Sequence, residues 1–314
     1  MDGFINAVSA CAVLLLLMSV GYFMGRMGWM TAKEKKFLSK YIVNIAVPCN
    51  CVVGLLNNLD HDDLIRAGIQ VVSGILGVAA TLLLSFGVAA LLRLPRERMG
   101  VFVAMAGFSN TLFIGIPVST HLFGEVCMPY VMLYYLANTI FVQSVGILII
   151  ERSGTKKEAG RGIAGFCKDV FTKPPILGVL GTVLLLILDL RPPEILMQFA
   201  DYVSGSVSPM ALIYCGFIVY EVGLKSLRLM PGLPTMLILR LAVAPVICYV
   251  FCLLFGVTGL ARDVFLVESA LPVVTQVTVL AGAYGADEKY AATGACLSIF
   301  GCCISLPILM LLIS

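Results

Sequence analysis

The chain has few charged residues for its length. Only 12% of its 314 residues are Asp, Glu, Lys or Arg, whereas 60% are hydrophobic and the mean hydropathy is +1.02. A soluble domain needs a charged, solvated surface, and a chain of this composition would precipitate in water. We therefore exclude a soluble protein and expect the lipid bilayer to be the main partner of the chain.

Residues suited to catalysis or to nucleic-acid binding are scarce as well. His61 and His121 are the only histidines, and the sequence has no Walker loop, zinc-ligand signature or nucleophile elbow. The net charge of +3 is not gathered on one face or tail, because the charges lie in short runs between apolar stretches. We therefore expect no enzyme, no cofactor and no nucleic-acid partner.

Apolar windows long enough to cross a bilayer divide the whole chain. A spanning helix needs about 20 mostly apolar residues, and no alternating strand pattern competes for these segments. Ten windows meet this requirement: 4–25, 38–57, 68–92, 99–121, 127–150, 174–190, 196–220, 235–257, 263–285 and 290–313. The sequence therefore predicts an all-α integral membrane protein with ten transmembrane helices.

Positive charge is distributed unevenly between the loops. Seventeen of the 21 Lys and Arg residues lie in or beside the odd-numbered loops, three lie in the even-numbered loops, and Arg240 lies within the eighth window. Cytoplasmic loops carry the excess of positive charge in membrane proteins. We therefore expect a multi-pass protein of the plasma (inner) membrane, with both termini outside the cytoplasm.

The most hydrophilic stretch divides the chain near its midpoint. A cytoplasmic connecting loop, 152–173, separates a first five-helix repeat, 1–151, from a second five-helix repeat, 174–314. An odd number of helices in each repeat forces the repeats into opposite orientations, as in transporters with inverted repeats. In such folds the substrate site lies near the midplane, where matching helices are broken. We therefore expect the fourth and ninth helices to be broken and to cross.

Proline occurs inside both of these windows. The fourth window contains the run from Ser109 to Pro117, and the ninth contains the run from Glu268 to Gln276, which includes Pro272. A proline within a helix frees a carbonyl and crowds the preceding turn, so the backbone needs other partners inside the membrane. A packing kink explains a single proline, whereas two matched breaks beside amide side chains favour a polar centre that holds an anion or a cation.

These residues resemble the auxin efflux carrier family, which includes the PIN-FORMED proteins of plants and many bacterial members. The plant proteins carry a near-identical Asn-Thr-Leu-x-x-Gly-Ile-Pro motif on the fourth helix, matched here by Asn110 to Pro117. Further similar features follow in the family's order: Arg240 with Pro245, then Ala270-Leu271-Pro272, then Leu306-Pro307-Ile308. More distantly, the chain resembles the bile-acid symporters.

The resemblance implies a scaffold of helices one, two, six and seven, and a transport unit of helices three to five and eight to ten that moves as an elevator. It implies a homodimeric secondary carrier, an efflux carrier of small organic anions such as an auxin-like monocarboxylate or a dicarboxylate like malate or malonate. The substrate-binding residues that we expect are Asn110, Gly115, Pro117, Pro272, Val273, Gln276 and Asn44. For Asn44, a bond to a neighbouring helix is the alternative.

Glu268 departs from the plant pattern, which has Gln at this position. An ionisable residue inside a membrane segment is costly and is a functional candidate by default. One interpretation places Glu268 at the wetted outer end of the ninth helix or beside a pairing neighbour. The other is a coupling site for Na⁺ or H⁺ formed by Glu268, Ser109 and Asn110, similar to the Ser-Asn pair and crossover Glu of the bile-acid symporters.

Two further questions stay open at the level of the sequence. Arg240 can either extend its side chain to the cytoplasmic interface or attract the substrate. The second function class is a membrane receptor or sensor that binds a small carboxylate without translocating it. Exchange of labelled acid across a membrane separates a carrier from such a sensor.

Overall fold

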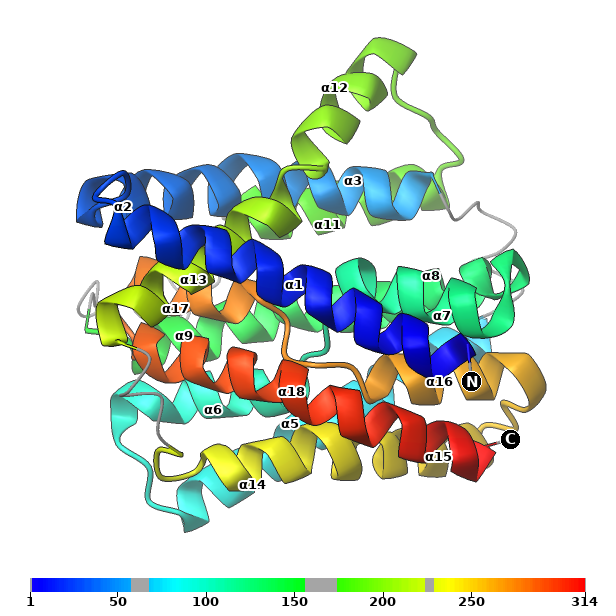
Figure 1. The fold of residues 1–314 in the computed structure, drawn as a ribbon. Helices are drawn as coiled ribbons and strands as arrows, with labels where there is room; N and C mark the ends of the chain where they lie inside the picture. The colour runs from blue at the N-terminus through cyan, green and yellow to red at the C-terminus, as the bar shows by residue number, and fades with distance from the viewer. Residues whose placement is uncertain (1, 58–67, 156–173, 224–228, 314) are drawn as a thin grey trace, which may run out of the picture.

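The computed structural model describes residues 2–57, 68–155, 174–223 and 229–313, and this part of the chain is built from helices (Figure 1). The first half contains α1 (Asp2–Arg26), α2 (Ala32–Tyr41), η1 (Ile42–Ala46), α3 (Val47–Leu56), α5 (Gly68–Leu91), α6 (Arg96–Gly107), η2 (Thr111–Gly115), α7 (Ile116–Phe123), η3 (Glu125–Cys127), α8 (Met128–Phe141), η4 (Val142–Gly146) and α9 (Ile147–Ser153). The second half contains α11 (Pro174–Ile187), α12 (Glu194–Ser204), α13 (Val207–Val222), α14 (Leu233–Ile238), η6 (Leu239–Val243), α15 (Ala244–Leu254), α16 (Gly259–Ser269), α17 (Gln276–Tyr284) and α18 (Glu288–Ile313). Within the described residues the only β-type pairing outside these helices is a single bridge between Ser109 and Val273. The predicted all-α class is therefore confirmed.

Six helical segments of the described chain are long and apolar enough to cross a membrane. They are Ala32–Leu56, Gly68–Leu91, Met128–Ser153, Glu194–Glu221, Leu233–Leu254 and Glu288–Ile313. The other four predicted windows correspond to α1, to the 14-residue α11, and to the interrupted pairs α6–α7 and α16–α17. The six segments support a multi-pass membrane protein, and the count of ten spans stays a prediction.

Three helical segments widen just before a proline. The π-helical segments η1, η2 and η6 end two residues before Pro48, Pro117 and Pro245. Proline has no N–H and its ring crowds the preceding turn, so the helix closes there with longer hydrogen-bonded turns. Each proline then lies in the first turn of the α-helix that follows. These prolines therefore change the pitch of their segments without ending the helical conformation.

The helices form two groups in space (Figure 1). In one group α3 packs against α11 and α12, while α1 lies along α13. In the other, α5 packs against α6, α8 and α15. The backbones of α1 and α13 approach closely at Gly21 and Gly216, where a methyl group would clash with the carbonyl of Ile213 or Met18 on the opposing helix. Small residues at such contacts are how membrane helices pack tightly.

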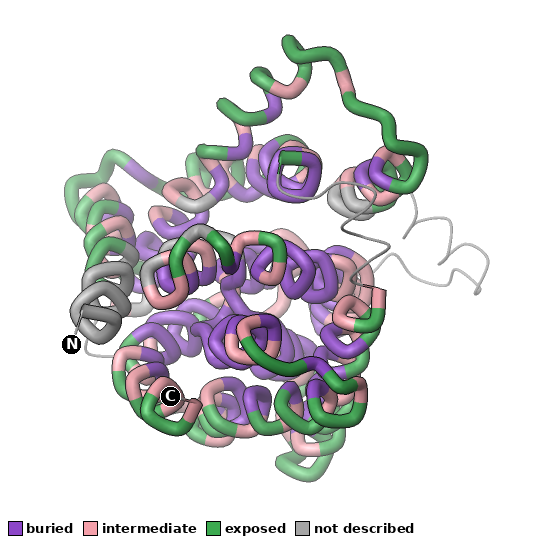
Figure 2. The backbone as a smooth tube through the Cα atoms, turned by 90° about the vertical axis from the view of Figure 1, so that its right-hand side faces the viewer, coloured by how far each residue is buried: buried purple, intermediate pink, exposed green. Residues whose placement is uncertain are grey.

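The outside of the bundle is apolar, and polar groups lie inside it. Leu83, Leu91 and Leu311 are 75%, 87% and 80% exposed, whereas Arg240 and Glu268 are buried. Figure 2 shows the exposed residues on the outer faces of the helices around a buried centre. An apolar exterior suits lipid, and buried charges in a membrane protein mark functional sites. We therefore expect the functional site in the interior.

Candidate functional site

Two helices are interrupted in the middle of the bundle. α6 ends at Gly107, and the chain leaves the helical conformation over 108–110 before η2 begins. α16 ends at Ser269, and the chain is non-helical over 270–275 before α17 begins. The interruptions predicted for the fourth and ninth windows are therefore present.

The two interrupted segments bond to each other. The Asn110 N–H donates to the Pro272 carbonyl at 2.9 Å, and the Val274 N–H donates to the Phe108 carbonyl at 3.2 Å. Lipid offers no partners for free backbone groups, so an interruption at this depth has to find its partners within the protein. The crossing supplies them, and this explains why the two breaks occur together.

Pro117 does not break the fourth helix. The interruption lies at 108–110, and Pro117 falls in the first turn of α7, directly after the widened η2, where a missing N–H is tolerated. The prediction of a break at Pro117 is therefore wrong in position. Pro272, by contrast, lies within the non-helical segment of the ninth window, as predicted.

Arg240 binds the C-terminal ends of both interrupted helices. Its guanidinium, in a residue that is 1% exposed, donates to the Ala106 carbonyl at 3.1 Å and to the Ser269 carbonyl. These carbonyls lie in the last turns of α6 and α16, where partial negative charge gathers and intrahelical donors are lacking. An extension of Arg240 to the interface is therefore wrong. The guanidinium instead compensates two negative helix ends.

After each interruption a new helical segment begins, η2 in the first and α17 in the second. The N-termini of these two segments face a small central cavity. Thr111 begins η2 and Gln276 begins α17, and both line this cavity. Its volume is about 40 Å³, which holds about three water molecules. Both halves of the chain contribute to its lining: Ile42, Asn50, Ser109, Asn110, Thr111, Tyr135, Asn138, Thr139, Val142, Gln143, Val207, Ala211, Val274, Thr275 and Gln276. Partial positive charge at helix N-termini favours an anion there.

Amide groups dominate the bonding around this cavity. Gln143 and Gln276 bond to each other in both directions, at 3.1 and 2.9 Å. The Asn138 amide donates to the Ser109 carbonyl at 3.0 Å. Asn138 Oδ1 and Ser109 Oγ are buried without a hydrogen-bond partner among the described residues. Such atoms in a polar cavity mark places where a ligand or water completes the bonding.

A second polar chain reaches the cavity from outside the crossing. The Ser204 hydroxyl donates to Asn50 Oδ1 at 2.9 Å, and the Asn50 amide donates to the Tyr135 hydroxyl at 3.2 Å. These two hydrogen bonds join α12, α3 and α8. Asn50 and Tyr135 are not among the predicted site residues, although an amide in the middle of an apolar window is a usable signal for Asn50.

The residues expected to bind substrate are only partly brought together. Asn110 and Gln276 line the central cavity. Four others belong to the two interrupted windows without lining the cavity: Gly115, Pro117, Pro272 and Val273. Asn44 lies elsewhere, because its side chain is exposed and its amide donates to the Lys40 carbonyl one turn earlier at 2.9 Å. This bond stays within the segment that carries Asn44 and does not reach a neighbouring helix. Asn44 does not line the central cavity.

Glu268 lies in the last turn of α16 and is 0% exposed. One carboxylate oxygen accepts from the Ser119 hydroxyl at 2.8 Å, and the other is buried without a partner among the described residues. The carboxylate packs against Gly115, where a methyl group would clash with it. Glu268 is therefore not wetted, and its bond to Ser119 fits the alternative of a pairing neighbour. Ser109 and Asn110 line the central cavity, which Glu268 does not.

Comparison with known proteins identifies the family of this chain. A family model described as "Membrane transport protein" matches residues 6–310. The chain belongs to this membrane transport protein family. It is the family to which the auxin efflux carriers belong, so the resemblance carried by the Asn110 to Pro117 motif is confirmed.

Relatives of this family member are found in archaea and in an animal. An uncharacterised transporter of Methanocaldococcus jannaschii is 23% identical over 289 residues, which cover 90% of each chain. An uncharacterised transporter of Methanothermobacter thermautotrophicus is 24% identical over 315 residues, covering 97% of this chain and 98% of that protein. The lysosomal cholesterol signaling protein of Mus musculus is 24% identical over 92% of this chain and 35% of its own length. Two of these relatives are thus named transporters.

Proposed function

We propose that this membrane transport protein is a secondary active carrier of small organic anions, and in particular an efflux carrier of carboxylates. The observation that carries the proposal is the asymmetry of the crossing. Arg240 compensates the partial negative charge at the C-terminal ends of α6 and α16. The N-terminal ends of η2, at Thr111, and of α17, at Gln276, face the central cavity. Helix N-termini and amide donors favour a carboxylate at that place.

The substrate is either an auxin-like monocarboxylate or a dicarboxylate similar to malate or malonate. The donors around the cavity are amides, hydroxyls and helix ends, which accept a range of carboxylates. A cavity of about 40 Å³ is smaller than these molecules, so substrate entry requires its walls to separate. The reciprocal Gln143 and Gln276 pair lies in the lining of the cavity, and we expect substrate entry to open it. Alternating access by such a separation is the proposed mechanism, without a chemical step.

The proposed architecture is ten transmembrane helices in two inverted repeats, 1–151 and 174–314. The scaffold comprises α1 to α3 and α11 to α13, and the moving unit comprises α5 to α9 and α14 to α18. The two spatial groups of helices support this division, since α1 packs on α13 and α3 on α11, while α5 packs on α6 and α15. The protein is a homodimer in the plasma (inner) membrane with both termini outside the cytoplasm.

Transport is coupled to a cation at Glu268, and a proton fits the described contacts better than Na⁺. A buried carboxylate without a cationic partner is costly to ionise, and one proton removes that cost. A metal cation needs several oxygen ligands, and the hydrogen bond described for this carboxylate comes from Ser119 alone. Net uptake or efflux that substrate alone drives, and that does not change when the pH gradient or the Na⁺ gradient is collapsed or in Glu268→Gln, would exclude this coupling.

The second candidate function is a receptor that binds a small carboxylate without moving it. The observation that favours it is the name of the mouse relative, which is a signaling protein. Reconstituted protein loaded with unlabelled acid separates the two. A carrier accumulates external labelled malonate, malate or indole-3-acetate by exchange, whereas a receptor binds the acid without accumulation.

A further inference from the structure

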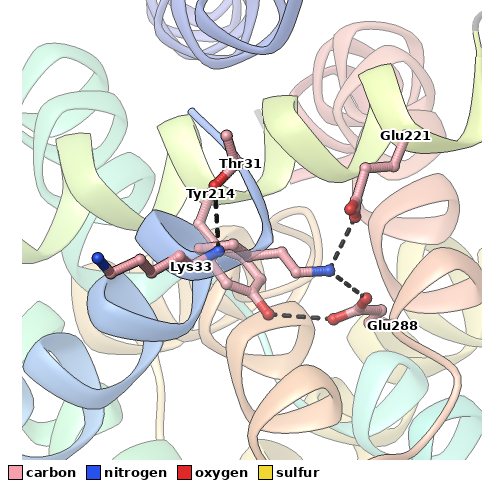
Figure 3. A network of polar contacts seen from close by, with 6 residues as sticks. Thr31, Lys33, Tyr214, Glu221 and Glu288 are labelled. Carbon is pink, nitrogen blue, oxygen red and sulfur yellow. Dashed lines mark hydrogen bonds and ion pairs between the residues drawn. The ribbon is translucent and has the colours of Figure 1, made fainter. Parts of the chain in front are cut away.

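Three helices meet in a polar network away from the central cavity. The Lys35 ammonium of α2 lies 2.8 Å from a carboxylate oxygen of Glu221 in α13 and 2.8 Å from one of Glu288 in α18. The Tyr214 hydroxyl of α13 donates to the other oxygen of Glu288 at 3.1 Å. Figure 3 shows the two carboxylates approaching the same ammonium, with Lys33 pointing away from it.

The Glu288 carboxylate occupies a position that fits any small carboxylate. Each of its two oxygens has a donor of its own, the Lys35 ammonium for one and the Tyr214 hydroxyl for the other. Charge-assisted bonds of this kind are stronger than neutral ones. The Lys35 side chain is 17% exposed, and α17 closes the position at Gly282, where a methyl group would clash with Tyr214 and Glu288.

The network is also unbalanced in charge. Two carboxylates share one ammonium, which leaves one negative charge without its own partner inside the network. Glu221 and Glu288 therefore repel each other across Lys35, and this weakens the binding of either carboxylate in the network. Glu288 is the one with a second donor, so its position is the one that can hold a ligand.

A groove of about 510 Å³ leads to this position. Lys35, Lys36 and Lys40 line its α2 side, and Gly282 and Glu288 lie on the opposite side. Three lysines in one groove attract anions. The charge pattern of the loops places this end of α2 in the cytoplasm, so the groove would collect acids from the side on which an efflux carrier finds its substrate.

The groove and the central cavity lie at opposite ends of one helix. α17 begins at Gln276, which lines the cavity, and ends at Tyr284, which lines the groove. Nine residues of α-helix span about 13 Å. An acid in the groove is therefore one short helix away from the proposed transport site.

We propose that Lys35 and Tyr214 form a second binding site for the carboxylate group of a small organic acid, which Glu288 occupies when no acid is present. An acid that enters the groove displaces Glu288, and this releases α18 from α2 and α13. The consequence for transport rests on the proposed function, in which α18 belongs to the moving unit and α2 and α13 to the scaffold. The binding site itself does not depend on transport.

Chemical rescue tests the site directly. In Glu288→Ala the position is vacant while Lys35 and Tyr214 remain, and we expect amide hydrogen exchange at the start of α18 to become about fivefold faster, the change given by losing one half-buried ion pair. Acetate or propionate at about 100 mM should fill the vacancy and restore slow exchange, a concentration suited to the weak binding of a small fragment. Sodium chloride at the same ionic strength should not. The full chain in lipid nanodiscs is used throughout.

Matched variants make the outcome decisive. Lys33 lies in the same helix as Lys35, but its side chain points away from the network (Figure 3). In Lys33→Gln, amide hydrogen exchange at the start of α18 should therefore equal that of wild type. In Lys35→Met with Glu288→Ala, acetate should no longer restore slow exchange. Glu288→Gln keeps the side-chain volume and provides the comparison if the alanine variant does not fold. Rescue by chloride, or rescue without Lys35, would overturn the proposal. Failure of counterflow with rescue intact would overturn only the transport function.

Discussion

Replacing Arg240 with Met would remove both hydrogen bonds that hold the ends of α6 and α16 together. Hydrogen bonds from charged donors contribute about 1.5–3 kcal/mol each, so the two contribute about 3–6 kcal/mol. When the crossing opens locally, the guanidinium stays inside the bundle. The cost of burying its charge is therefore the same in the closed and the open crossing and does not offset the loss of the two hydrogen bonds. At about 1.4 kcal/mol for each factor of ten, we expect the crossing to open roughly 10²- to 10⁴-fold more often in Arg240→Met.

Amide hydrogen exchange of the protein in nanodiscs measures this opening. The Asn110 and Val274 N–H groups report it, because they bond across the crossing at 2.9 and 3.2 Å. Arg240→Lys keeps the charge but replaces the fork of donors by a single ammonium, so we expect about half of the loss in free energy and a roughly 10- to 100-fold increase in exchange. Exchange within α5 serves as the internal control. Wild-type exchange at both amides in Arg240→Met would refute this role of Arg240.

Gly216→Ala pushes a methyl group against the backbone of α1, and we expect overpacking to lower the free energy of unfolding by about 1–3 kcal/mol in thermal denaturation. Gly181→Ala places its methyl group in open space within α11 and should not lower the melting temperature, so an equal loss in both variants would contradict the packing argument. A double-mutant cycle of Gln143→Ala and Gln276→Ala should give a coupling energy of about 1 kcal/mol, whereas strict additivity would speak against their pairing. Glu268→Gln should make net efflux of the acid independent of the pH gradient, and a persisting dependence would remove Glu268 as the proton site.

The membrane class and the paired interruptions could be predicted because each follows from a physical requirement readable along the chain. Bilayer thickness fixes the length of an apolar window, and an odd number of windows per half forces opposite orientations. The exact place of the first break could not be predicted. It is set by the bonds of Asn110 to Pro272 and of Val274 to Phe108, which join segments far apart in the sequence. Pro117 suggested a different place because a proline signals only local strain.

The roles of single polar residues depended even more on distant contacts. Arg240 binds carbonyls of Ala106 and Ser269, and nothing near Arg240 in the sequence identifies these partners. Asn44 and Asn50 are six residues apart in one segment, yet only Asn50 reaches the central cavity. Asn44 lies within the widened η1 and Asn50 in α3, so the two residues do not face the directions that an ideal helix would give them. Ligand-facing positions in such a helix therefore require the structure.

Counterflow in proteoliposomes tests the central claim, that small organic anions cross the membrane through the site at the crossing. Vesicles loaded with unlabelled malonate, malate or indole-3-acetate should accumulate at least one of the corresponding labelled acids. Asn110→Ala and Gln276→Ala should reduce that accumulation at least tenfold while the protein stays folded, because each removes an amide from the central cavity and with it about 1.4 kcal/mol or more of binding. Lys33→Gln should leave it unchanged. Binding of an acid without accumulation, or equal accumulation in all four proteins, would contradict the account.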